Sequence, residues 1–250
     1  EQCTHQDVAK LHADLFSATD NVLDMTMGLG VDSFYISRKV NSVIGIELNE
    51  EIAEISKFNY SEMAPNLRVI NANSVDYIRN CRNRYSAVFI DPARRDTSGK
   101  RTYGFHDCTP DVIDLLTDIK KITHRLVIKA SPMLDISQSI KELRHIKDIW
   151  VIAIKNSCKE LLFDLDLSQE SDEIGITIHT INFDTTIQRF DIPLSSICQN
   201  APVKTYPTIE SNRFLLEPNA SIMKSGMTNY LYEEFGEIAK IDVCSHLFIA

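Results

Sequence analysis

The stretch that most constrains how this chain can fold is Asn21–Asp32, with the sequence NVLDMTMGLGVD. It joins a short apolar strand at Val22 and Leu23, a loop that holds Gly28 and Gly30, and the apolar start of a helix. A strand that runs through a glycine-containing turn into a helix is the phosphate- or nucleotide-binding element of doubly wound α/β folds. Glycine lets a ligand approach the backbone closely and tolerates positive φ. The alternative is an ordinary strand-to-helix turn that holds two glycines.

A second feature follows at the spacing that a nucleotide site requires. The strand-like segment SVIGIEL, residues 42–48, carries Glu47 nineteen positions after Gly28. An acidic residue at the end of the second strand is placed to accept hydrogen bonds from a ribose diol. The nicotinamide pattern G-x-G-x-x-G would need a glycine where Ser33 stands. An NAD-dependent oxidoreductase is therefore the weaker alternative.

Strands and helices alternate along the first 155 residues. A helix is expected at 5–16 and the first helix after the glycine loop at 31–40. Further strands are expected at 67–71, 86–90, 125–130 and 149–155, and further helices at 50–63, 74–81, 109–122 and 137–146. Asn49 and Thr109 are the expected N-caps of two of these helices, with Pro110 at the first helical position. Because the strands are continuous apolar runs, they predict a mostly parallel sheet covered on both faces.

The rhythm changes after residue 156. Strand-like runs at 161–165 and 174–183 have no helix between them, which favours an antiparallel hairpin at the edge of the sheet. The segment 202–210 contains two prolines and is typical of a linker. Residues 219–235 are expected to be helical in two pieces broken around Gly226, and the final HLFIA is a strand-like run without a visible partner. We predict one α/β domain at 1–183 and a linker with a partial C-terminal segment at 184–250.

Composition excludes several classes of protein. Hydrophobic residues make up 44% and charged residues 24% of the 250 residues, as in soluble globular proteins. No apolar run is long enough for a membrane span, and the polar start has no signal-peptide core. Six scattered cysteines without a CxxC pair favour reduced thiols in a cytoplasmic protein and argue against a zinc site. The first residue is Glu1 rather than Met, which indicates a fragment of a longer protein.

Positive charge is concentrated in one place, although the net charge is −9. The stretch from Arg79 to Arg101 has a local excess of five positive charges. Its cations are Arg79, Arg82, Arg84, Arg94, Arg95, Lys100 and Arg101, against Asp91 and Asp96. Such a stretch can bind nucleic-acid phosphates or form an ordinary solvated face.

The glycine loop resembles the first motif of class I S-adenosylmethionine-dependent methyltransferases, acidic-x-Gly-x-Gly-x-Gly. Asp24-x-Thr26-x-Gly28-x-Gly30 carries Thr26 in place of the first glycine. The resemblance implies a Rossmann-like, seven-stranded fold that binds S-adenosylmethionine, with Asp24 facing the methionine end of the cofactor. Asn73 stands where the family usually has an aspartate that accepts from the adenine amino group, and its alternative role is a helix N-cap. The implied cofactor site comprises Asp24, Thr26, Gly28, Gly30, Glu47, Asn73, Ser74 and Asp91.

The loop after the fourth strand, Asp91-Pro92-Ala93-Arg94, resembles the [Asp/Asn]-Pro-Pro-[aromatic] motif of amine-methylating members. In that motif the acidic side chain and the proline carbonyl accept hydrogen bonds from the target NH₂ group. The implied catalytic residues are Asp91, Pro92 and Arg94, where Arg94 replaces an aromatic residue that stacks on a base. Arginine can also stack on a base. The alternative is that Asp91 only caps the turn.

Three stretches carry a closer resemblance: DMTMGLGVD, DPARRD with the following KRTYGFHDCTPDV, and LLEPNASIMKSG. Together they resemble bacterial class I methyltransferases with a C-terminal THUMP-like segment. This implies methylation of a base in RNA, either tRNA or rRNA, without a metal. A catalytically inactive RNA-binding protein of the same fold is the alternative. Cys108 is a candidate nucleophile for C5-pyrimidine methylation or a buried bystander.

Overall fold

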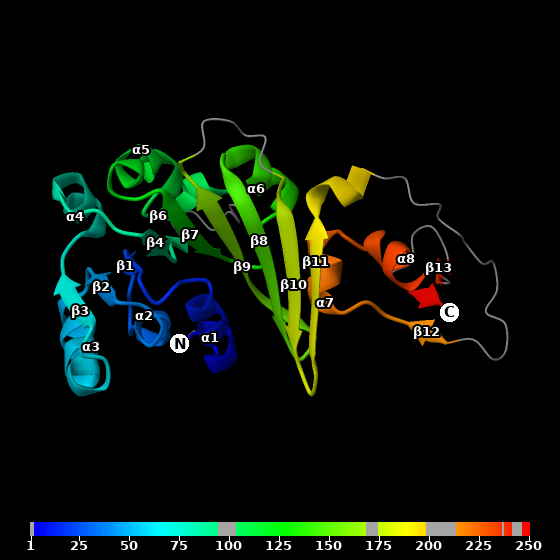
Figure 1. Ribbon diagram of the computed structural model, residues 1–250, viewed down its shortest axis with the longest axis horizontal. Coiled ribbons are helices and arrows are strands. Elements are labelled where there is room, and N and C mark those ends of the chain that lie inside the picture. The colour runs from blue at the N-terminus through cyan, green and yellow to red at the C-terminus, as the bar shows by residue number, and fades with distance from the viewer. Residues whose placement is uncertain (1–2, 95–103, 169–174, 199–213, 237, 242–246) are drawn as a thin grey trace. The chain divides into compact units, whose positions relative to one another are not determined.

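A computed structural model of the protein describes residues 3–94, 104–168, 175–198, 214–236, 238–241 and 247–250. The chain divides into two compact units (Figure 1). The first comprises Glu1–Ile146 and Leu162–Asp172, and the second comprises Lys147–Leu161 and Glu173–Ala250.

The first unit is built on a parallel sheet. Its strands β7 (Arg125–Ala130), β4 (Ala87–Ile90), β1 (Asn21–Asp24), β2 (Ser42–Glu47) and β3 (Leu67–Asn71) lie in that order. All four neighbouring pairs are parallel. The part of β9 (Ser157–Asp166) that belongs to this unit lies beside β7. The order runs outward in both directions from β1 and β4, so a topological switch point lies between these two strands.

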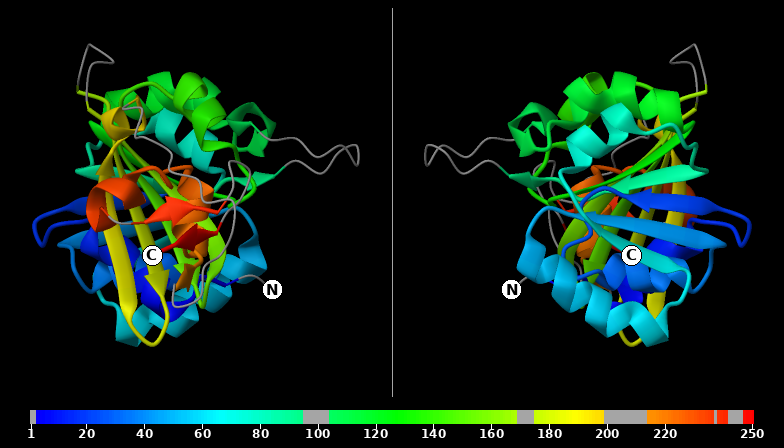
Figure 2. Two further views of the ribbon diagram at one scale, coloured as in Figure 1. Left: turned by 90° about the vertical axis from the view of Figure 1, so that its right-hand side faces the viewer. Right: turned by 90° about the vertical axis from the view of Figure 1, so that its left-hand side faces the viewer.

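Helices cover both faces of this sheet, as predicted. The face with α4 (Ser74–Asn80) and α5 (Val112–Ile122) is opposite the face with α2 (Val31–Ser37) and α3 (Glu50–Met63) (Figure 2). Helix α1 (Gln6–Asp14) packs against α2, and α6 (Ile136–Glu142) follows β7. Strand residues such as Leu23, Phe89 and Leu126 are at most 1% exposed. Burial of each such side chain contributes roughly 1.5–3 kcal/mol.

Three predicted helix ends were wrong. Helix α2 ends at Ser37 rather than at residue 40. The N-cap of α5 is Asp111 rather than Thr109, and the Asp111 side chain accepts from the Ile113 and Asp114 N–H groups. Thr109 instead lies in β6 (Cys108–Thr109), which pairs with β5 (Ala93–Arg94) and follows the 3₁₀ helix η1 (Phe105–Asp107). Helix α6 ends at Glu142, because the apolar residues from Ile146 onward belong to a strand. The predicted N-cap Asn49 is confirmed, with its side chain 3.0 Å from the Ile52 nitrogen.

The second unit contains the predicted antiparallel edge hairpin, but its strands differ from those expected. Strand β10 (Thr177–Phe183) pairs in parallel with β8 (Ile146–Ile154) and antiparallel with β11 (Ile187–Pro193). The predicted hairpin of 161–165 with 174–183 was therefore wrong, because β8 takes the place beside β10. A two-residue turn joins β8 to β9. Its residues, Lys155 and Asn156, both have positive φ, as type I′ hairpin turns require.

The C-terminal part of this unit forms small elements. Helices α7 (Ala220–Ser225) and α8 (Tyr230–Phe235) are separated at Gly226, which has a φ of 74°, so the predicted break is confirmed. The last strand, β14 (Phe248–Ile249), pairs with β12 (Leu215–Leu216) and β13 (Ala239–Lys240), so the expectation of no partner was wrong. The 3₁₀ helix η2 (Leu194–Cys198) follows β11. None of the helices in the described ranges is long and apolar enough to cross a membrane.

Candidate active site

The predicted site residues of the first unit gather at the carboxyl ends of neighbouring strands. The glycine loop follows β1, Glu47 ends β2 and Asp91 follows β4. Lys129 is the penultimate residue of β7. Because these strands are parallel, their carboxyl ends share one edge of the sheet, which is where open α/β sheets bind ligands.

Both glycines of the loop are required by its backbone. Gly28 has a φ of 55° and Gly30 a φ of 78°. A Cβ on Gly30 would overlap the Met27 side chain and lie 2.7 Å from Cε2 of Tyr60, whereas a Cβ on Gly28 would meet no atom within 4 Å. Side chains therefore fill the space beside Gly30, whereas the space beside Gly28 is open. The open space leaves room for a ligand close to the Gly28 backbone.

Two side chains of α3 donate hydrogen bonds to backbone carbonyls of this loop. The Ser56 hydroxyl donates to the Gly28 carbonyl at 3.1 Å, and the Tyr60 hydroxyl donates to the Leu29 carbonyl at 2.8 Å. Ser56 and Tyr60 lie one helical turn apart and therefore share a face of α3. Sequence reasoning missed both residues, and their four-residue spacing is the signal that could have found them.

Glu47 joins the end of β2 to the glycine loop. Its Oε2 accepts from the Gly28 N–H at 2.9 Å, and its Oε1 accepts from the Asn49 N–H at 2.7 Å. These two bonds fix the carboxylate at the mouth of the loop, where the sequence predicted an acceptor for ribose hydroxyls. The next residue, Leu48, has 70% of its surface exposed.

Asp24 is almost completely buried beneath the same loop. Its carboxylate accepts from the Ser33 hydroxyl at 2.6 Å and from the Thr26 N–H at 3.0 Å. Burial raises the pKa of the Asp24 carboxyl to about 7, although these two hydrogen bonds oppose the shift. A cation beside Asp24 would favour its ionised form.

Thr26 and Asp91 connect the glycine loop to the loop after β4. The Thr26 hydroxyl accepts from the Asp91 backbone N–H at 2.7 Å. Thr26 departs from the glycine of the resembling motif, and this hydrogen bond gives its side chain a specific role. The Asp91 side chain is partly exposed, with Oδ2 2.8 Å from the Lys129 ammonium, whereas Pro92 is buried.

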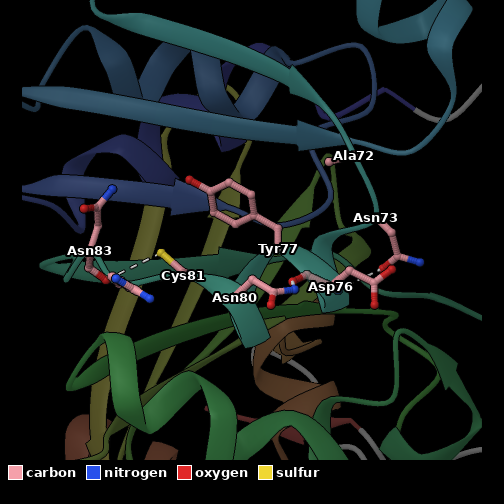
Figure 3. A pocket seen from close by; sticks show the side chains of 8 residues that line it. Ala72, Asn73, Asp76, Tyr77, Asn80, Cys81 and Asn83 are labelled. Atoms are coloured by element: carbon pink, nitrogen blue, oxygen red, sulfur yellow. Dashed lines mark hydrogen bonds between the residues drawn. The ribbon is translucent and has the colours of Figure 1, made fainter.

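Asn73 and Ser74 lie at the start of α4. The Asn73 side chain accepts from the Val75 and Asp76 N–H groups, so its N-cap alternative is confirmed, and Ser74 is the first residue of the helix. Asn73 also lines an open groove of about 570 Å³ (Figure 3). The groove follows α4 and is lined by Ala72, Asn73, Asp76, Tyr77, Asn80, Cys81, Arg82 and Asn83.

The remaining predicted residues are only partly described. Arg94 pairs through its backbone with Cys108, but its side chain and residues 95–103, including Arg95, Lys100 and Arg101, lie outside the described residues. Arg79 pairs with Asp118 at 3.2 Å, so part of the basic stretch is neutralised. The Cys108 thiol is buried, 3.8 Å from the Gly104 carbonyl, which favours the bystander alternative.

Comparison with known proteins supports the fold. A Porphyromonas gingivalis W83 protein, solved as a candidate methyltransferase, is 24% identical with a TM-score of 0.82; the match covers 99% of this chain and 61% of that one. M. capricolum TrmK, solved with S-adenosylhomocysteine, is 12% identical with a TM-score of 0.51; the match covers 67% of this chain and 70% of that one. These likenesses show a class I methyltransferase fold.

Two sequence comparisons concern parts of the chain. An uncharacterized RNA methyltransferase of Mycoplasma mobile is 28% identical over 109 residues, which cover 43% of this chain and 27% of that protein. The chain therefore spans about a quarter of the length of this curated relative. A family described as a ferredoxin-like domain matches residues 214–250.

Proposed function

We propose that this chain is an S-adenosylmethionine-dependent methyltransferase that modifies a base in RNA. The observation that carries the proposal is the hydrogen bond between the Glu47 carboxylate and the Gly28 N–H, which supports Glu47 as an acceptor for ribose hydroxyls beside the glycine loop. The hydrogen bond between Thr26 and Asp91 connects this loop to a motif that can hold a methyl acceptor. In this proposal, the methyl donor and the methyl acceptor bind next to one another at the switch point between β1 and β4.

The chain offers a partner for each part of the cofactor. The open backbone at Gly28 allows close approach, and the Glu47 carboxylate suits the ribose diol. Asp24 suits the methionine ammonium, because a cation would favour ionisation of this buried acid. The side-chain oxygen of Asn73 suits the adenine amino group, provided that it accepts from this group and from the N–H groups of α4 at the same time. Gly30 and Ser74 support the loop and the start of α4.

The chemistry follows from the loop after β4. S-adenosylmethionine supplies a methyl group on a positively charged sulfur. The Asp91 carboxylate and the Pro92 carbonyl accept hydrogen bonds from the target amine and aim its lone pair at the methyl carbon. With S-adenosylmethionine bound, the target nitrogen would bond to the methyl carbon as the carbon–sulfur bond breaks, and the nitrogen would then lose its proton to solvent. Positioning of this kind can supply a large share of the rate enhancement.

RNA is the proposed substrate, and tRNA or rRNA is the proposed class. The RNA methyltransferase name of the Mycoplasma mobile relative and the basic stretch from Arg79 to Arg101 support it. We further propose that residues 184–250 belong to a THUMP-like RNA-binding segment, that Arg94 stacks on the target base, and that the enzyme acts in the cytoplasm.

The test is transfer of a labelled methyl group from S-adenosylmethionine to total bacterial RNA, followed by identification of the modified nucleoside. Asp91→Ala should abolish transfer with little loss of stability, because Asp91 lies partly exposed at a strand end. Asp14→Ala is a matched control, since Asp14 also pairs with a lysine, Lys39, at 2.7 Å but lies on α1. RNA binding without transfer by the unmodified chain would instead identify an inactive RNA-binding protein.

A further inference from the structure

Lys129 lies at the centre of a polar cluster that includes Asp91, Asp32 and Thr4. Its ammonium is 2.8 Å from Asp91 Oδ2, 3.3 Å from Asp32 Oδ2 and 2.8 Å from the Thr4 hydroxyl. Only 13% of the Lys129 side chain is exposed. An ammonium has three N–H donors, so these contacts match its donor count and fix its position.

Asp32 is itself held in place. Its Oδ1 lies 2.9 Å from Nδ1 of His12, which is completely buried, and its Oδ2 accepts from the Thr4 hydroxyl at 2.7 Å. Burial alone would raise the pKa of Asp32, but His12, Lys129 and Thr4 together hold it well below its usual range. Asp32 is therefore a fixed anion. It anchors the ammonium that contacts Asp91.

We propose that Lys129, anchored by Asp32, is a positioning residue that holds the Asp91 carboxylate in the orientation needed to accept from the target amine. This inference rests on the proposed function and names a residue that acts through Asp91. The Asp91 side chain is 43% exposed, so a carboxylate in that place can change its rotamer and be hydrated. Lys129 reaches it from β7 and limits both motions, because the lysine stem is buried and its other donors are occupied.

The same cluster gives the N-terminal segment a part in the site. Thr4 precedes α1 and His12 lies within it, yet both contact Asp32 at the start of α2. Helices α1 and α2 also pack against one another. Residues before the glycine loop therefore contribute to the orientation of Asp91. Thr4 and His12 hold Asp32, Asp32 anchors Lys129, and Lys129 contacts Asp91.

The experiment is a double-mutant cycle of Lys129→Met and Asp91→Asn, measured as turnover at saturating total bacterial RNA. Asparagine at position 91 keeps a carbonyl acceptor. Lys129→Met alone should lower turnover about ten- to a hundred-fold, the size expected from misplacing a catalytic group. Because Lys129 acts through Asp91, the same change in the Asp91→Asn protein should cost less than about three-fold. Within either background, Lys129→Met should change the affinity for S-adenosylhomocysteine less than about two-fold. Lys57→Met, at an exposed lysine paired with Glu54, is the matched control.

The outcomes separate the alternatives. Equal losses from Lys129→Met in both backgrounds would show a purely structural role and overturn the inference. If Asp91→Asn has no measurable turnover, the cycle cannot be completed, and the turnover of Lys129→Arg is compared with that of Lys129→Met instead. Recovery of at least about ten-fold over Lys129→Met then supports the ion pair, and no recovery overturns it. Absence of methyl transfer by the unmodified chain would count against the proposed function itself, a result distinct from an additive cycle.

Discussion

The Ser33 hydroxyl donates a 2.6 Å hydrogen bond to the carboxylate of Asp24, and both side chains are buried beneath the glycine loop. Ser33 occupies the position where a nicotinamide-binding pattern requires its third glycine. At this position the serine hydroxyl therefore has a hydrogen-bond acceptor, Asp24, that a glycine could not use. The hydrogen bond ties the first turn of α2 to the end of β1, and it makes the ionisation of Asp24 part of the loop's stability.

The pH dependence of stability should reveal Asp24. Its pKa is raised to about 7 in the folded chain, so between pH 4 and 7 the folded state keeps a proton that the unfolded state releases. This group therefore lowers the free energy of unfolding as pH rises through that window, by about 4 kcal/mol at most. Asp24→Asn removes the effect. Its amide oxygen can still accept from the Thr26 N–H, and its NH₂ group can donate to the Ser33 hydroxyl oxygen. Urea unfolding should show the variant gaining stability over the unmodified protein from pH 5 to 8. A constant difference across that range would contradict the assignment.

Alanine substitutions at the two loop glycines should lower the free energy of unfolding by different amounts. Gly30→Ala combines left-handed strain with overlap on Met27 and Tyr60, and we expect a loss of roughly 2–4 kcal/mol in the free energy of unfolding. Gly28→Ala meets open space and should cost only the strain, about 1–2 kcal/mol. Thermal or urea denaturation measures both. Equal losses would show that packing beneath Gly30 is unimportant.

Cys108 should be dispensable for methyl transfer. Its thiol is buried and lies near the Gly104 carbonyl, so it is poorly placed to attack a base. Cys108→Ser should keep transfer within about three-fold and form no covalent RNA adduct, as would be expected of a bystander thiol. Denaturing gel electrophoresis after incubation with RNA detects such an adduct. An adduct in the unmodified protein that disappears in the variant would instead establish C5 chemistry.

Salt dependence should test the basic stretch. If Arg94, Arg95, Lys100 and Arg101 contact phosphates, log affinity for structured RNA should fall with log salt with a slope of about −2 to −4. Removing Lys100 and Arg101 should flatten the slope by roughly one to two units and leave S-adenosylhomocysteine affinity unchanged. Substituting Lys39 and Lys57, which lie on the α1–α3 side of the sheet, controls for net charge. An unmoved slope would make the stretch an ordinary solvated face.

Sequence patterns predicted the parallel sheet because strands such as β4 and β7 hold short apolar runs, at Ala87–Ile90 and Leu126–Ile128, and the predicted bounds of β3 and β7 are confirmed. They failed where pairing depends on distant segments. The tight turn at Lys155 and Asn156 joins β8 to β9, and β10 pairs with the other edge of β8. The short strand β14 pairs with β12, which lies well before it in the sequence. At the site, the glycine loop and Glu47 follow known spacings. The four-residue spacing of Ser56 and Tyr60 marks a shared helix face, but neither it nor the sequence around Lys129 identifies their partners, because these contacts form only when separate elements pack together.

The most direct test of the central claim is calorimetric titration of the protein with S-adenosylhomocysteine, alongside Glu47→Ala and the control Glu51→Ala. Glu51 is an exposed acid in the first turn of α3. The account predicts one site with unchanged affinity in Glu51→Ala. In Glu47→Ala it predicts a loss of about 1.5–3 kcal/mol, because the ribose hydroxyls lose a charged acceptor. Binding of NADH without binding of S-adenosylhomocysteine would contradict the account and favour the oxidoreductase.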